Sequence, residues 1–82
     1  MAQNTTLRVT LARIDGPLFD GDAISVTVPG VEGEMTILPH HEDLISPLKK
    51  GVITVKTADG EHFFEITKGT LEVSNNQATV LI

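Results

Sequence analysis

The chain has 82 residues, 11 acidic against 6 basic side chains, a net charge of −5 and no cysteine. These values predict one small domain without disulfide bonds or zinc–thiolate sites, and they argue against nucleic acid as a partner. No apolar run approaches the ~20 residues that span a bilayer, and the opening residues lack the pattern of a signal peptide, so no direct membrane insertion is expected.

Apolar side chains recur at every second position near the start of the chain, which is typical of half-buried β-strands. A first strand is predicted over residues 7–14, and it ends where Asp15-Gly16-Pro17 supplies turn chemistry. The alternation resumes at Ile24 and stops at Pro29-Gly30. The first thirty or so residues therefore predict two strands separated by a turn-containing connection.

A brief strand is predicted over residues 34–38, followed by a loop over residues 39–47 that has room for at most one helical turn, because a proline stands at each end. Residues 52–57 and 62–67 predict a hairpin, since the Asp59-Gly60 step supplies the positive φ that a tight turn requires. A second hairpin is predicted around Asn75-Asn76, because asparagine tolerates the left-handed region.

Many short strands with closely spaced turn signals and no helical period predict an all-β fold, an antiparallel β-sandwich or flattened barrel. Residues 1–82 are expected to form it as one domain. The phase of Phe63 against Phe64 stays open, because either can be the inward residue. The predicted core consists of Leu7, Val9, Leu11, Phe19, Ile24, Val26, Val28, Met35, Ile37, Ile53, Val55, Phe64, Ile66, Leu71, Val73, Ala78 and Val80.

The segment His40-His41-Glu42-Asp43 holds the side-chain types that most often bind zinc or act as acid and base. Adjacent residues of an extended segment point to opposite sides, and no His-Glu-x-x-His spacing is present. The sequence also lacks a Gly-x-Ser-x-Gly nucleophile motif and a phosphate-binding Gly-Lys-Ser/Thr. We therefore expect a solvated loop, without a catalytic residue, cofactor or metal.

The order and spacing of several motifs resemble the epsilon subunit of the F-type rotary ATP synthase, specifically its N-terminal β-sandwich domain. The longest is Glu32-Gly33-Glu34-Met35-Thr36-Ile37-Leu38-Pro39, and the resemblance extends over nearly the whole chain. The other matching motifs are the strand over 7–14, Phe19-Asp20-Gly21, Ile24-Ser25-Val26, His41, Leu44, Lys50-Gly51, Gly69, Leu71-Glu72-Val73, Asn76 and Thr79-Val80.

The resemblance implies a flattened barrel of about ten strands at the foot of the central stalk of a proton- or sodium-translocating ATP synthase. It implies a non-catalytic rotor part that joins the gamma subunit to the polar loops of the membrane rotor ring during ATP synthesis, peripheral to the cytoplasmic face of a bacterial inner membrane. By position, the rotor-ring contacts are Glu32, Gly33, Glu34, His40 and His41, and Glu32, Gly33 and His40 are expected to be neighbours on one loop. The gamma-subunit contacts are Thr10, Arg13, His41, Leu44, Ser46, Thr67, Lys68 and Thr70.

The chain also departs from the family pattern. It ends at Leu81-Ile82, where the family commonly continues into two helices that carry inhibition of ATP hydrolysis and, in some members, ATP binding. We therefore expect neither property. His40 and Lys68 stand where glycine is frequent, and Glu42-Asp43 replace a small residue and a proline. Two alternatives stay open: Glu34 and His41 as ordinary solvated turn residues, and a free-standing β module that binds a small ligand or a metal at residues 40–43.

Overall fold

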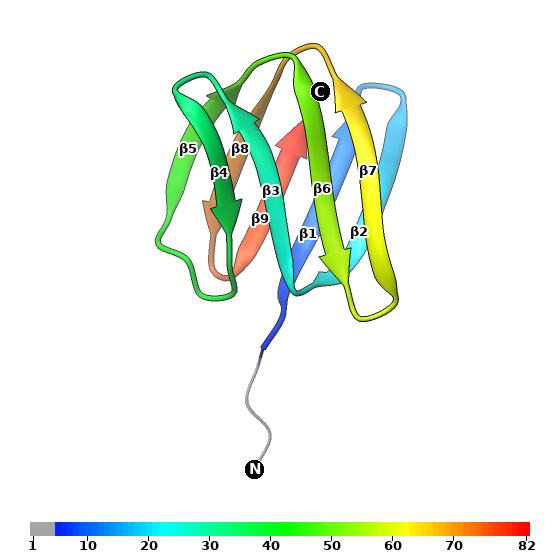
Figure 1. The fold of residues 1–82 in the computed structure, drawn as a ribbon, viewed down its shortest axis with the longest axis vertical. Coiled ribbons are helices and arrows are strands. Elements are labelled where there is room, and N and C mark those ends of the chain that lie inside the picture. Colours follow the sequence, from blue (N-terminus) through cyan, green and yellow to red (C-terminus); the bar gives the residue numbers. More distant parts are fainter. Residues whose placement is uncertain (1–4) are drawn as a thin grey trace.

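The computed structural model describes residues 5–82, which form nine β-strands and no helix, and thus no helix that could cross a bilayer (Figure 1). The strands are β1 (Leu7–Arg13), β2 (Gly16–Ala23), β3 (Ser25–Gly30), β4 (Gly33–Ile37), β5 (Leu44–Leu48), β6 (Gly51–Thr57), β7 (Gly60–Ile66), β8 (Gly69–Ser74) and β9 (Gln77–Leu81).

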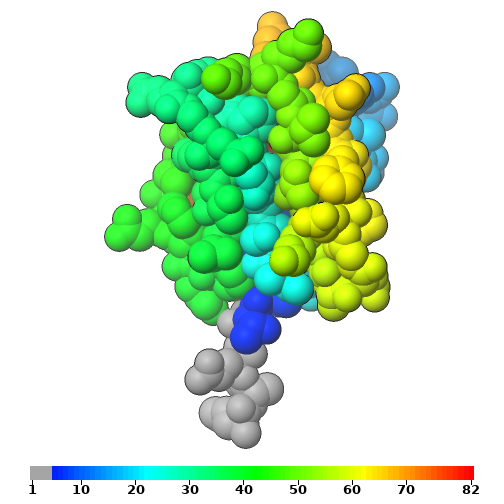
Figure 2. Space-filling model, viewed as in Figure 1, coloured from blue at the N-terminus to red at the C-terminus, as the bar shows by residue number. Residues whose placement is uncertain are grey.

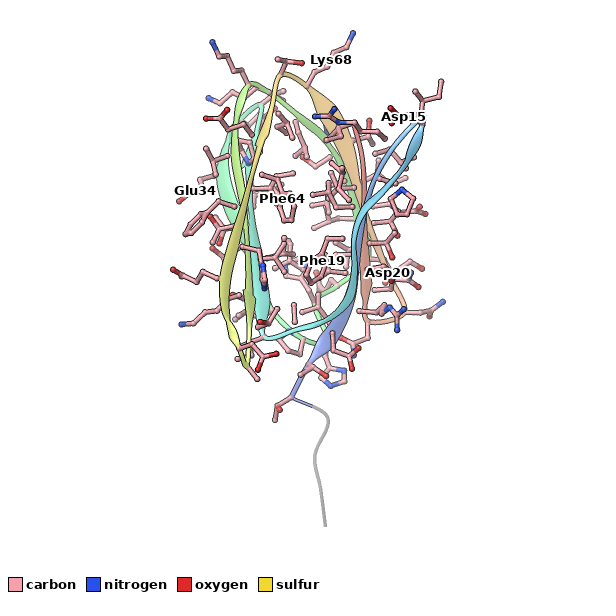
Figure 3. All side chains as sticks on the ribbon, turned by 90° about the vertical axis from the view of Figure 1, so that its right-hand side faces the viewer. Asp15, Phe19, Asp20, Glu34, Phe64 and Lys68 are labelled. Atoms are coloured by element: carbon pink, nitrogen blue, oxygen red, sulfur yellow. The ribbon has the colours of Figure 1, made fainter. Side chains whose placement is uncertain are left out.

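The strands lie in two layers that face each other across a shared core (Figures 1 and 3). The hydrogen-bonded order is β2-β1-β9-β8-β5-β3-β6-β7, and β4 pairs with β3. The layer of β2, β1, β9, β8 and β5 meets the layer of β4, β3, β6 and β7 where Gly30 pairs with Leu48. The predicted all-β sandwich is confirmed, with nine strands in the described residues and with one parallel pair, β1–β9, among antiparallel ones.

Side chains close the sandwich between β2 and β7, the two ends of the hydrogen-bonded path. The Phe19 ring lies 6.2 Å from the Phe64 ring in an edge-on arrangement, and 5.6 Å from the His62 ring. Both phenylalanines point between the layers (Figure 3). Phe64 is half-buried and Phe63 is 63% exposed, so the phase that the sequence leaves open is settled in favour of Phe64.

The core is built from alternate residues of both layers, as the alternation predicts. Ile24 is the exception among the predicted core residues. It is 40% exposed, because it lies at the bend between β2 and β3, where Ala23 takes the inward position. The buried residues are Leu7, Val9, Leu11, Ala23, Val26, Val28, Ile37, Leu48, Ile53, Val55, Ile66, Leu71, Val73, Ala78 and Val80, with Phe19, Met35, Leu44, Phe64 and Ile82 packed against them.

The predicted loop over residues 39–47 is wrong in its second half, which belongs to β5. Pro47 is compatible with a strand here because its carbonyl group, rather than an N–H, makes the bond to the neighbouring segment, accepting from Val31 N–H at 3.1 Å. The two predicted hairpins are confirmed. Gly60 has φ +136°, and Asn75 and Asn76 have φ 53° and 60°.

Turns gather at the two ends of the sandwich (Figure 1). We call the end that carries the turns at 14–15, 31–32, 49–50 and 67–68 the upper end. The lower end carries the loop 38–43 and the turns at 58–59 and 75–76. Which candidate contact residues lie close together depends on these two ends.

Candidate partner-binding interface

Strand β4 separates the candidate ring-contact residues into two groups. Glu32 lies in the β3–β4 turn at the upper end and Gly33 and Glu34 begin β4, whereas His40 and His41 follow the other end of β4. At ~3.3 Å per residue, β4 extends roughly 13 Å from Gly33 to Ile37, and His40 and His41 come after that end of the strand. The expectation that His40 shares one loop with Glu32 and Gly33 is therefore wrong.

The upper turn is a tightly packed hairpin turn beside a cleft. A Cβ atom at Gly30 would lie 2.7 Å from the Gly33 carbonyl oxygen, so glycine is required at the end of β3, where it pairs with the start of β4. Glu34 points away from the core (Figure 3). The turn thus presents carboxylates on a rigid base. A cleft of about 380 Å³ between the turn and β5 is lined by Gly30, Val31, Glu32, Gly33, Glu34, Met35, Ile45, Ser46 and Pro47.

The histidine loop at the lower end is shaped by backbone bonds. His40 has φ 66°, and its N–H donates to Asn76 Oδ1 at 2.7 Å. His41 N–H donates to the Leu38 carbonyl oxygen at 3.2 Å, and His41 Nδ1 lies 2.8 Å from the Glu42 carbonyl oxygen. Among residues 5–82, no group of three or more His, Cys, Asp or Glu side chains is placed to hold a metal ion. The loop is thus a shaped surface element.

The candidate gamma-contact residues divide by the direction of their side chains. Thr10 of β1 and Thr70 of β8 lie on the outer face of their layer, and Arg13, Thr67 and Lys68 lie at its upper end. Leu44 and Ser46 occupy the inward, half-buried positions of β5, and Leu44 packs against the core. The outward positions of β5 belong to Ile45 and Pro47, which the loop prediction missed because a loop has no strand phase.

Cross-strand pairing arranges the outward residues of this layer in rows, two of which run across β1, β9, β8 and β5 toward the upper end. Ile45 and Leu81 are large apolar residues, 73% and 58% exposed, and Glu72 is the one charged residue within these two rows. Beside the rows, Asp20 of β2 lies opposite Thr10 and forms an ion pair with Arg8 at 2.8 Å. An exposed, nearly uncharged surface with large apolar side chains is typical of a protein contact. We call it the neutral face. It comprises Thr10, Thr79, Glu72 and Ile45 in one row, and Ala12, Leu81, Thr70 and Pro47 in the next.

The outer face of the other layer, which Figure 2 shows from green β4 to yellow β7, carries more charge than the two rows of the neutral face. A row of three threonines ends at the exposed Phe63, and the hydroxyls of Thr27 and Thr36 lie 3.0 Å apart. The outward positions on both sides of this row include Glu34, Glu65, Lys56 and Glu61. The neutral face is accordingly the better candidate for an extended protein contact.

Solved structures and curated sequences with similar folds and residues come from ATP synthases. Over 99% of this chain, a chain of the Euglena gracilis mitochondrial ATP synthase structure with OSCP, F1 and c-ring superposes with a TM-score of 0.88 at 24% identity, and 52% of that chain is covered. A chain of the Tetrahymena thermophila mitochondrial ATP synthase central stalk and c-ring structure gives a TM-score of 0.77 at 15% identity over 99% of this chain and 65% of that one. These two similarities establish the fold.

Sequence similarity establishes the family. The ATP synthase epsilon chain of a Nitratiruptor species is 45% identical over 94% of this chain and 60% of its own length. That of Alkalihalophilus pseudofirmus is 39% identical over 94% of this chain and 58% of its own length, so the chain spans less than two thirds of these relatives. The β-sandwich domain of the ATP synthase delta/epsilon chain matches residues 6–82, and the chain therefore belongs to that family.

Proposed function

We propose that this domain is a non-catalytic part of the central stalk of an F-type ATP synthase, where it joins the gamma subunit to the membrane rotor ring during ATP synthesis. The proposal is supported by the family match over residues 6–82 and by relatives named ATP synthase epsilon chain. The complex would hold the domain at the cytoplasmic face of a bacterial inner membrane, and the ring would translocate protons or sodium ions.

The neutral face is the observation that carries this proposal to individual residues. We assign the gamma contact to it, with Thr10, Thr70, Ile45 and Leu81 presented outward and Arg13, Thr67 and Lys68 at its upper border. Leu44 and Ser46 support the contact from the inward side of β5. Two hydrogen-bonded layers around a close-packed core resist shear, so torque applied at this face is transmitted to the opposite parts of the domain.

The upper turn is the part of the domain that we assign to the rotor ring. Glu32 and Glu34 are exposed there, with Gly33 between them, so both side chains are open to a partner. Such a turn can accept hydrogen bonds from the polar loops of a ring without entering lipid. His40 and His41 lie beyond the far end of β4, so we place both with the gamma contacts, to which His41 already belonged as a candidate.

Titration of the domain with its gamma subunit, by calorimetry, tests the proposed function. We expect a one-to-one complex that Thr10→Arg weakens by tenfold or more (about 1.4 kcal/mol for each factor of ten), because the longer side chain obstructs the contact surface and replaces the Thr10 hydroxyl that now donates to Asp20 at 3.4 Å. Thr54→Arg is the matched control, since Thr54 is a half-buried, outward-facing threonine of a central strand in the other layer. No binding by the folded wild-type domain, or equal losses in both variants, would contradict the assignment.

The ring contact has a separate test, because its residues lie on the upper turn. Glu32→Lys should lower the affinity of the preformed gamma–domain complex for the isolated ring about tenfold at low ionic strength, with less effect as salt is added. Glu61→Lys, the same exchange of charge near the lower end, is the control and should leave the affinity within about twofold of wild type. Equal affinities for Glu32→Lys and wild type would exclude the turn as the contact.

A further inference from the structure

Asn76 joins three segments at the lower end of the sandwich that are far apart in the sequence. Its side-chain Oδ1 accepts a hydrogen bond from His40 N–H at 2.7 Å, and its Nδ2 donates to the Thr6 carbonyl oxygen at 3.0 Å. Its backbone carbonyl oxygen accepts from Arg8 N–H at 3.1 Å. One residue thus connects the loop after β4, the segment that leads into β1, and the β8–β9 turn.

The neighbouring Asn75 shows that the turn alone does not explain these bonds. Asn75 and Asn76 have nearly the same left-handed backbone, with φ 53° and 60°, as a two-residue turn of this type requires. Asn75 is exposed and takes part in none of the three bonds, whereas Asn76 is half-buried and uses its amide both as donor and as acceptor. Both residues therefore supply the backbone conformation of the turn, and only the Asn76 side chain bonds to His40 and Thr6.

The histidine loop needs an anchor of this kind. His41 N–H bonds to Leu38, three residues away, and His41 Nδ1 lies against the carbonyl of the next residue. Bonds to such close neighbours shape a loop without fixing its position on the domain. His40 itself has φ 66°, a conformation that is uncommon outside glycine and persists where surrounding contacts hold it. The bond from His40 N–H to Asn76 fixes the position of the loop on the domain and also helps to hold this backbone conformation.

We propose that Asn76 is a positioning residue: it anchors the His40–His41 loop to the β8–β9 turn and thereby fixes the place at which the His41 ring meets the gamma subunit. The anchoring is a property of the free domain. The contribution to partner binding rests on the proposed function. Neither histidine nor Asn76 performs chemistry in this arrangement, since the effect is to hold a contact surface in its binding conformation before the partner arrives.

The test compares Asn76→Gly with Asn75→Gly in the 82-residue chain. Glycine adopts positive φ at both positions, so the two variants share any effect on the turn and differ in the loss of the Asn76 amide. Hydrogen exchange of the His40 amide, followed by NMR, should be about fivefold to tenfold faster in Asn76→Gly than in Asn75→Gly, which is the effect of one lost hydrogen bond. Asn76→Asp keeps an acceptor for His40 N–H, so it should restore most of the protection.

The same three variants are then titrated with the gamma subunit. We expect Asn76→Gly to bind about fivefold more weakly than Asn75→Gly, and Asn76→Asp to recover part of the difference. Equal exchange of the His40 amide in the two glycine variants would overturn the positioning role. Faster exchange with unchanged affinity would overturn the link to binding. A wild-type domain that binds no gamma subunit would contradict the proposed function, and the exchange data would still decide the anchoring.

Discussion

Leu71→Ala should lower the free energy of unfolding by about 3–5 kcal/mol, the range for a leucine whose removal leaves a cavity in a rigid core. Leu71 is fully buried in the middle of β8, where it pairs with Ser46 on one side and Val80 on the other. Both neighbouring strands are held by backbone bonds and cannot collapse into the space. A domain of 82 residues has a total stability of roughly 4–12 kcal/mol, so this variant should be near its unfolding threshold.

Urea denaturation of Leu71→Ala and Leu81→Ala measures this effect against a matched control. Leu81 belongs to the adjacent strand β9 and is 58% exposed, so its truncation should change the stability by less than about 1 kcal/mol. The slope of the unfolding curve should stay the same, since the surface exposed on unfolding is similar. If both variants shifted the midpoint equally, the inward phase of β8 would be wrong.

Gly30→Ala should destabilise the domain by about 1–3 kcal/mol, through overpacking instead of a cavity. A Cβ atom at this position would lie 2.7 Å from the carbonyl oxygen of Gly33 and 3.1 Å from Met35 Cε. The methionine can turn aside, but the carbonyl oxygen belongs to the strand that pairs with Gly30 in the upper turn. The strands must therefore move apart at the place where the proposed ring contact is built.

Gly21→Ala is the control for this change, because the nearest atoms to its added Cβ are those of the Phe19 ring at an ordinary 3.8 Å. There the substitution should be neutral or slightly stabilising, since alanine reduces the conformational freedom of the unfolded chain. Thermal unfolding of both variants decides the matter. A Gly30→Ala domain as stable as wild type would show that the upper turn is looser than the packing indicates.

The alternation of apolar residues predicts most of the fold, because strands with one buried face require it. It fails for β5, where Ser46 takes an inward position and Pro47 weakens the strand signal. No strand is predicted over β2 either, since two glycines, a proline and two aspartates lower its strand propensity. β5 is held by pairing with the distant strand β8, and β2 by its hairpin with β1, and the alternation within one segment contains neither pairing.

The candidate site shows the same division between local and distant information. The strand end at Pro29-Gly30 and the acidic motif that begins at Glu32 are visible in the sequence. The separation of Glu32 from His40 depends on β4 being fully extended between them. The neutral face depends on register, because the pairings of β1 with β9, β9 with β8 and β8 with β5 place Ile45 and Leu81 on the same face as Thr10. Sequence spacing alone does not specify which residues lie side by side across strands.

The parallel pairing of β1 with β9 has a consequence for synthesis of the protein. β1 can form a hairpin with β2 as soon as both leave the ribosome, but its other edge receives a partner only when β9 has emerged. Until then a nascent chain carries an unpaired strand edge in the middle of its future layer, and such edges recruit other chains. Chaperone protection should therefore matter most while the ribosome is completing this strand.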